Sequence, residues 1–180
     1  MEWLVIDENY LNYIRNKESR IPKSDYGNDK YKPFFGILFE TDNFYYVTQV
    51  SHPKQKHFTM KANEDFKKIF DSKSNRLIAV INLNYMFPIP KNMYNKLQYK
   101  DLDKHRTFRD EKEKSKYISL MRTELKVINT MGLDKVALKV YNNKYDKPDS
   151  NLAKRCIDFK DMERLALQYE KEWYILLVRK

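Results

Sequence analysis

Short apolar runs alternate with polar turn segments in the first half of the chain, a pattern typical of antiparallel strands. Strands are predicted at Trp3 to Ile6, Pro33 to Glu40, Phe44 to Val50 and Arg76 to Leu83, with a short edge segment at Met86 to Pro90. Asp42 and Asn43 form a two-residue turn signal, which predicts a hairpin between the second and third of these strands. Pro53 then ends the hairpin, because proline cannot donate to the ladder.

Helical spacing of apolar residues dominates the second half. Helices are predicted from the cap residue Asp7 through Ile14, at Asn63 to Phe70, at Asp103 to Asn129 with a stop at Gly132, at Leu133 to Tyr141, and at Asn151 to Trp173. Loops are predicted at 20–32, 51–57 and 144–150. The prediction is therefore an α+β fold, an antiparallel sheet wrapped by helices. We expect one domain over 1–180, with a sheet-rich catalytic core over 1–90 and a helical part over 91–180.

Length and composition exclude several classes of protein. The chain has 180 residues, only three glycines and one cysteine, Cys156. A glycine-rich phosphate loop, a disulfide framework and a cysteine-based zinc site are therefore excluded. No apolar run approaches the roughly 20 residues that span a bilayer, and the first residues lack the features of a signal peptide. We expect a soluble cytoplasmic protein with no membrane partner, no cofactor and no metal.

The positive charge of the chain adds a candidate class of partner. Lys and Arg number 35 against 25 Asp and Glu, a net charge of +10, and tyrosines number 14. Scattered solvated lysines account for such a composition in many proteins. A polyanion partner, chiefly nucleic acid, accounts for it equally well, because Lys and Arg displace counterions from phosphates and tyrosine rings stack on bases.

The densest polar cluster is Ser-His-Pro-Lys-Gln-Lys-His over 51–57. Antiparallel pairing of the predicted hairpin would bring Lys32 to the same end as Ser51. RNA can be cut without a metal when a base takes the 2′-hydroxyl proton, an acid protonates the 5′-oxygen and cations hold the phosphate charge. Histidine, lysine and serine side chains supply these roles. The alternative is an ordinary solvated turn.

Three segments together carry a resemblance to a known family. They are Lys32-x-Phe34-Phe35-Gly36-Ile37-Leu38, Val50 to His57, and Ile81-Asn82-Leu83-x-x-Met86-x-Pro88-Ile89. In order and spacing they resemble the type III toxin–antitoxin endoribonucleases of the ToxN/AbiQ family. The resemblance covers roughly residues 1–90, and the helical half matches in character more than in sequence.

The resemblance implies a compact, strongly twisted antiparallel sheet related to the Kid/MazF toxins, with added helices. It implies metal-independent, sequence-specific cleavage of cellular and phage RNA that leaves 2′,3′-cyclic phosphate and 5′-hydroxyl ends. It also implies a small antitoxin RNA, cut from a repeat transcript into pseudoknots that inhibit the toxin and join it in a closed protein–RNA assembly. Several such systems act in abortive phage defence.

Residues of this chain that match the family's motifs are candidates for the site. Ser51, Lys54 and Lys32 are expected in the active site, with Tyr26 or Tyr31 contacting RNA. The chain departs from the family at His52, where a small hydroxyl residue is expected. Either Ser51 performs that role shifted by one position, or His52 has taken over acid or base duty. The further candidates for RNA contact are Lys30, Lys56, His57, and Lys112, Lys114 and Lys116 on the long helix, for which a solvated face is the alternative.

Two other classes of function remain. A non-catalytic RNA-binding regulatory module would share the charge and the aromatic residues without needing Ser51 and Lys54. A DNA-binding regulator would need a helix-turn-helix, and no convincing one is present.

Overall fold

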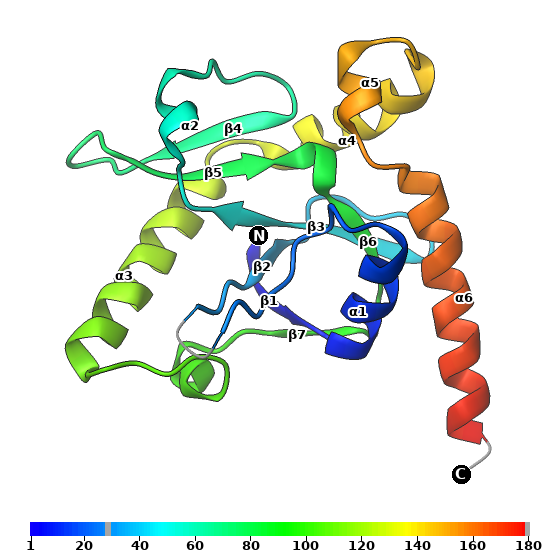
Figure 1. Ribbon diagram of the computed structural model, residues 1–180, viewed down its shortest axis with the longest axis horizontal. Helices are drawn as coiled ribbons and strands as arrows, with labels where there is room; N and C mark the ends of the chain where they lie inside the picture. The colour runs from blue at the N-terminus through cyan, green and yellow to red at the C-terminus, as the bar shows by residue number, and fades with distance from the viewer. Residues whose placement is uncertain (28–29, 179–180) are drawn as a thin grey trace.

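The apolar runs of the first half pair edge to edge into one antiparallel sheet, seen in the computed structural model (Figure 1). The structure describes residues 1–27 and 30–178. The strands are β1 (Glu2–Ile6), β2 (Phe34–Gly36), β3 (Phe44–Ser51), β4 (Phe66–Phe70), β5 (Leu77–Asn82), β6 (Phe87–Pro90) and β7 (Tyr94–Lys96). Their order is β4-β5-β3-β2-β1-β7, and β6 also pairs with β3. The α+β fold with an antiparallel sheet is confirmed.

Strand β3 is the centre of this sheet and the return strand of the predicted hairpin. Phe34 of β2 pairs with Gln49, and Phe35 pairs with Thr48. Regular pairing of β2 ends at Gly36, and the hairpin continues through the Leu38 amide, which donates to the Tyr46 carbonyl at 2.9 Å. The hairpin is therefore confirmed, with an irregularity in the first of its two strands.

Helices surround the sheet and close its core. They are α1 (Glu8–Lys17), α2 (Gln55–Thr59), α3 (Glu111–Ile128), α4 (Leu133–Asp146), α5 (Asn151–Arg155) and α6 (Phe159–Val178), with 3₁₀ turns at Leu83–Tyr85 and Tyr99–Lys104. Asp7 caps α1, because its side chain accepts a hydrogen bond from the Tyr10 amide at 2.9 Å. The main core cluster draws on both halves of the chain, from Trp3 to Ala166. In Figure 1, α3 and α6 lie on opposite sides of the sheet.

The helix predicted at Asn63 to Phe70 is wrong. The Asn63 side chain accepts hydrogen bonds from the Asp65 and Phe66 amides at 3.2 and 2.8 Å. This turn resembles a helix cap, but the chain leaves it as β4, which pairs with β5 and buries Phe66 and Ile69. Pairing with a neighbouring strand therefore overrides the local helix signal.

Several predicted boundaries also differ. The predicted helix from Asp103 begins at Glu111, where the Asp110 side chain accepts from the Glu113 amide at 2.7 Å. The last predicted helix is broken between α5 and α6, where the Asp158 carboxylate accepts from the Asp161 amide at 3.1 Å. The loop predicted at 144–150 begins only after α4 ends at Asp146, and the loop predicted at 51–57 contains the start of α2. Strand β7 lies in the half that was expected to be helical.

No helix within the described ranges combines the length and the apolar character that crossing a bilayer requires.

Candidate functional site

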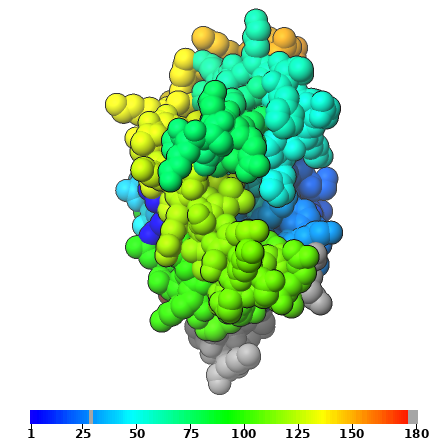
Figure 2. All heavy atoms as spheres, turned by 90° about the vertical axis from the view of Figure 1, so that its left-hand side faces the viewer, coloured from blue at the N-terminus to red at the C-terminus, as the bar shows by residue number. Residues whose placement is uncertain are grey.

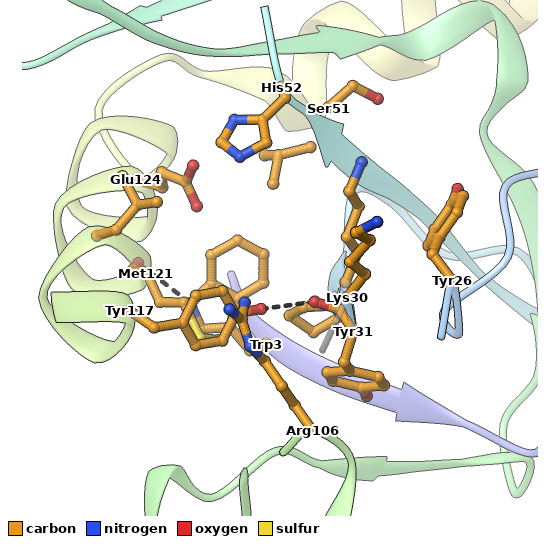
Figure 3. Close-up of a pocket in the computed structure, with 14 residues that line it drawn as sticks. Trp3, Tyr26, Lys30, Tyr31, Ser51, His52, Arg106, Tyr117, Met121 and Glu124 are labelled. Carbon is orange, nitrogen blue, oxygen red and sulfur yellow. Dashed lines mark hydrogen bonds between the residues drawn. The ribbon is translucent and has the colours of Figure 1, made fainter. Parts of the chain in front are cut away.

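A pocket of about 410 Å³ lies where the end of β3, the segment before β2 and the inner side of α3 meet. Figure 3 shows its lining, and Figure 2 turns the side of the molecule that carries α3 toward the viewer. Polar side chains from distant parts of the chain face this space, namely Lys30, Lys32, Ser51, His52, Arg106 and Glu124. Among the described residues, no three His, Cys, Asp or Glu side chains gather as a metal site would require.

The hairpin register explains why Lys32 and Ser51 share the pocket. Pairing of Phe34 with Gln49 sets the two positions at the same end of the hairpin, as predicted. The buried Gln49 amide fixes the segment before β2, because it donates to the carbonyls of Lys32 and Lys23 at 2.7 and 3.0 Å. The backbone of Lys32 is therefore held by strand pairing and by a side chain of the partner strand.

Lys54 lies outside the pocket lining, but close enough to influence it. Its backbone amide donates to Nδ1 of His57 at 3.0 Å, at the start of α2. Burial lowers the pKa of Lys32, and the positive charge of Lys54 lowers this pKa further. The structure therefore brings the two lysines of the predicted active site near one another.

His52 lies at the rim of the pocket with an exposed side chain. Desolvation lowers the pKa of its imidazole, and the charges of Lys32 and Arg106 lower it further. The folded protein therefore holds His52 neutral at neutral pH. A neutral imidazole can accept a proton from a bound hydroxyl group.

The structure separates the two tyrosines that were candidates for RNA contact. Tyr31 is 4% exposed and stacks on His105 with a centroid distance of 4.8 Å. Tyr26 is 39% exposed, and Nζ of Lys32 lies 4.8 Å from its ring centroid. An exposed ring that is flanked by a cation suits base stacking, so Tyr26 is the better candidate.

The expected RNA contact by His57 does not fit its position. The side chain is 7% exposed, and its Nδ1 accepts the Lys54 amide. This histidine therefore shapes the turn that carries Lys54. Lys56 is exposed on the same short helix and stays a candidate for RNA contact.

The lysines of α3 lie apart from the pocket lining. Lys112 and Lys116 are exposed, whereas Lys114 forms an ion pair with Asp103. Lys30 is exposed and does line the pocket. Lys112 and Lys116 thus remain candidates for an outer RNA surface.

Sequence reasoning missed Arg106, which lies in a run of mixed charge before α3. Its guanidinium carbon lies 4.5 Å from the Tyr117 ring centroid, and Nη2 contacts the Glu113 carboxylate at 3.0 Å. Its buried Nε has no hydrogen-bond partner among the described residues. The Tyr117 hydroxyl in turn donates to the Tyr31 carbonyl at 2.9 Å (Figure 3). Only the tertiary fold brings the contact between Arg106 and Tyr117 to the hairpin, so no local sequence pattern could have predicted it.

A second cavity of about 340 Å³ adjoins the first, and Tyr26 and Ser51 line both. Three further cations, Arg15, Arg20 and Lys23, line this second cavity. The pair of cavities therefore forms a cationic surface centred on the Ser51 hydroxyl and the Tyr26 ring. Such a surface suits a phosphodiester chain better than a small neutral ligand.

The fold and this surface define a small α+β protein whose cationic pocket holds a hydroxyl and an imidazole. A family model described as toxin ToxN of the type III toxin–antitoxin system matches residues 2–167. The chain therefore belongs to the ToxN toxin family of type III toxin–antitoxin systems. The family expected from the three sequence segments is confirmed.

Individual relatives agree with this assignment. Endoribonuclease ToxN of Pectobacterium atrosepticum is 26% identical over 120 residues, which are 57% of this chain and 69% of that protein. The solved structure of AbiQ, a lactococcal anti-phage endoribonuclease of a type III system, has a TM-score of 0.73 at 20% identity and covers 94% of this chain and 98% of its own. A second solved structure comes from work on type III systems in which a non-coding RNA pseudoknot inhibits the toxin. It has a TM-score of 0.72 at 19% identity and covers 94% of this chain and 97% of its own. The two solved structures establish the likeness in fold.

Proposed function

We propose that this chain is an endoribonuclease toxin that cuts RNA without a metal ion. The 2′-hydroxyl of the substrate attacks the adjacent phosphate, and the products carry 2′,3′-cyclic phosphate and 5′-hydroxyl ends. The observation that carries the proposal is the convergence of Ser51, His52 and Lys32 on one pocket, with Lys54 beside it. Family membership supports the same activity.

Each group has a role that its position suits. His52 is held neutral and accepts the proton of the 2′-hydroxyl. The Ser51 hydroxyl donates a hydrogen bond to a phosphate oxygen, and the ammonium group of Lys32, whose pKa burial lowers, gives the leaving 5′-oxygen its proton. Lys32 and Lys54 stabilise the negative charge that grows on the phosphate in the transition state. Tyr26 stacks on a flanking base, and Lys30 and Lys56 hold the backbone.

Inhibition by an RNA antitoxin is the second part of the proposal. A folded repeat RNA would occupy the two adjoining cavities and extend over the exposed lysines of α3, so that substrate is excluded. A solved protein with this fold belongs to a system whose toxin is inhibited by an RNA pseudoknot. We propose the same class of partner here, in a closed protein–RNA assembly that takes part in defence against phage.

The experiment is cleavage of a long RNA by the purified protein in EDTA, with mapping of the 5′ ends. We expect discrete cuts with 5′-hydroxyl ends, and a loss of at least about 100-fold in rate for Lys32→Ala and for Lys54→Ala. Lys135→Ala is the matched control, because Lys135 is exposed on α4 away from both cavities. Tight binding of RNA that stays intact would instead support the non-catalytic RNA-binding module.

A further inference from the structure

Glu124 is a buried carboxyl group on the α3 side of the first pocket. It is 6% exposed and lines the pocket together with the apolar side chains of Leu120 and Met121. Among the described residues, no hydrogen bond or ion pair reaches its carboxyl group. Figure 3 shows this group directed into the pocket, on the same side as His52.

An unpaired carboxyl in such a place is costly for the fold. Burial raises the pKa of Glu124 to about 8, so the group is mainly neutral at pH 7. The titratable and charged groups that share the pocket lie on several elements: Tyr117 on the same helix, His52 after β3, Arg106 on the loop before α3, and Tyr26, Lys30, Tyr31 and Lys32 on the segment before β2. None of them pairs with Glu124, and a leucine would pack against the same neighbours without the desolvation cost. The fold does not need a polar group at this position, which suggests that the Glu124 carboxyl binds a ligand.

The apolar and aromatic part of the pocket lining suits a heterocyclic base. Trp3 is fixed by its indole, which donates to the Met121 carbonyl at 3.2 Å, and it contributes to the apolar wall. Tyr117 also lines the pocket, with the Arg106 guanidinium over its ring. The polar end of the pocket holds Lys32 and Ser51, the groups proposed to hold the phosphate. Both parts belong to one pocket, and Glu124 is directed into it.

We propose that Glu124 is the base-reading residue of this site, and that its carboxyl accepts a hydrogen bond from the exocyclic amino group of a base adjacent to the scissile phosphate. Adenine, cytosine and guanine carry such a group, and uracil does not. A carboxyl oxygen accepts in either protonation state, and the neutral form can also donate its proton to a ring nitrogen of the same base. The inference rests on the proposed function and adds a determinant of sequence specificity to it.

The first test is cleavage of a randomised RNA pool, with the cut ends sequenced. We expect the wild-type protein to disfavour uracil by about 10-fold or more at one position beside the cut. Glu124→Leu should abolish the preference at that position only. Glu124→Gln keeps an acceptor and a donor and should retain it. Glu111→Gln is the matched control, because Glu111 is exposed on the same helix outside the pocket, and its preferences should equal those of the wild type.

The second test removes the amino group from the substrate instead of the carboxyl from the protein. An oligonucleotide with the preferred sequence and adenine at that position is compared with one that carries purine there, which lacks the amino group. The wild type should cut the second at least about 10-fold more slowly, and Glu124→Leu should cut both at equal rates. Unchanged preferences in Glu124→Leu, or an equal loss of rate on every sequence, would overturn the base-reading role.

Absence of RNA cleavage and absence of base reading by Glu124 give different results. If the wild type binds RNA without cutting it, the cleavage proposal fails, and the bound fraction of the same pool is sequenced instead. Depletion of uracil at one position that disappears in Glu124→Leu would still support base reading. Equal depletion in both proteins would overturn it. A thermal unfolding scan of each variant establishes that the compared proteins are folded.

Discussion

At the scale of single residues, His52 is where this chain departs from the pattern expected of its family. The imidazole takes a position at the rim of the pocket beside Lys32 and Arg106. Two positive neighbours and partial desolvation favour its neutral form, which is the form that a general base requires. The departure therefore replaces a hydroxyl by a group that can accept a proton.

The pH dependence of cleavage tests this role. A base must be deprotonated, so kcat/KM should fall as the pH drops through the pKa of His52, which lies below its ordinary value of 6.5. His52→Gln should lower the rate by roughly 100-fold or more and remove this acidic limb. The measurement is kcat/KM on one oligonucleotide from pH 4.5 to 8. An acidic limb that persists in the variant would assign it to another group.

The raised pKa of Glu124 also predicts how the free energy of unfolding depends on pH. Its pKa rises from 4.5 to about 8 on folding, so the folded state binds more protons than the unfolded state between these values. This contribution to stability is present at pH 4 and is lost as the pH rises toward 8. One pKa unit corresponds to about 1.4 kcal/mol, so the loss between pH 5 and 8 is roughly 3 kcal/mol.

Glu124→Leu should remove that dependence and raise the free energy of unfolding at pH 8. The measurement is urea unfolding of both proteins at pH 5, 6.5 and 8, analysed as the difference between them, because other groups titrate equally in both. Glu111→Gln again serves as the control. A difference that does not grow with pH would mean that the carboxyl is ionised and solvated in the folded protein.

At the scale of elements, the β2–β3 hairpin sets the geometry of the site. Strand pairing places Lys32 and Ser51 at the same end of the hairpin, and the buried Gln49 donates hydrogen bonds to the carbonyls of Lys23 and Lys32. The position of Lys32 therefore depends on Gln49, a side chain that lines the second cavity and not the first.

Gln49→Leu should therefore damage both stability and activity. Two carbonyls would lose their donor, at a cost of roughly 1–3 kcal/mol in unfolding free energy. The segment that carries Lys32 would also be released, which should lower kcat more than it raises KM. Urea unfolding and steady-state cleavage measure the two effects. Gln98→Met is the control, since Gln98 is exposed and its side chain makes no hydrogen bond among the described residues. Full activity in Gln49→Leu would contradict the positioning role.

Local patterns predicted the hairpin because two apolar runs and the turn signal between them lie within about twenty consecutive positions. The proximity of Lys32 and Ser51 followed from the same information. Arg106, Tyr117 and Glu124 could not be predicted in this way, because they reach the pocket only when α3 packs beside β1. The helix expected at Asn63 failed for a similar reason, since pairing of β4 with β5 decides that segment.

At the scale of the whole molecule, a net charge of +10 is distributed between the site and outer surfaces. The lining of the two cavities contains Lys30, Lys32, Arg106, Arg15, Arg20 and Lys23. Exposed Lys112 and Lys116 lie on α3, outside both linings. A short single-stranded substrate could be held by the cavities alone, whereas a folded RNA is large enough to reach α3.

Salt dependence separates these two surfaces. Each phosphate that a lysine neutralises in a single strand contributes roughly −0.7 to the slope of log K against log salt concentration, and in a duplex roughly −0.9. The double variant Lys112→Ala/Lys116→Ala should therefore reduce the slope by roughly 1.4 to 1.8 for a folded repeat RNA and leave it unchanged for a short single strand. Lys135→Ala/Lys154→Ala removes the same charge from exposed positions away from both cavities, and neither slope should change.

The measurement is RNA affinity between 50 and 300 mM salt, roughly the range in which phosphate contacts dominate. Equal slopes for the two double variants on the folded RNA would show that the α3 lysines are an ordinary solvated face, and the antitoxin would then be held by the cavities alone.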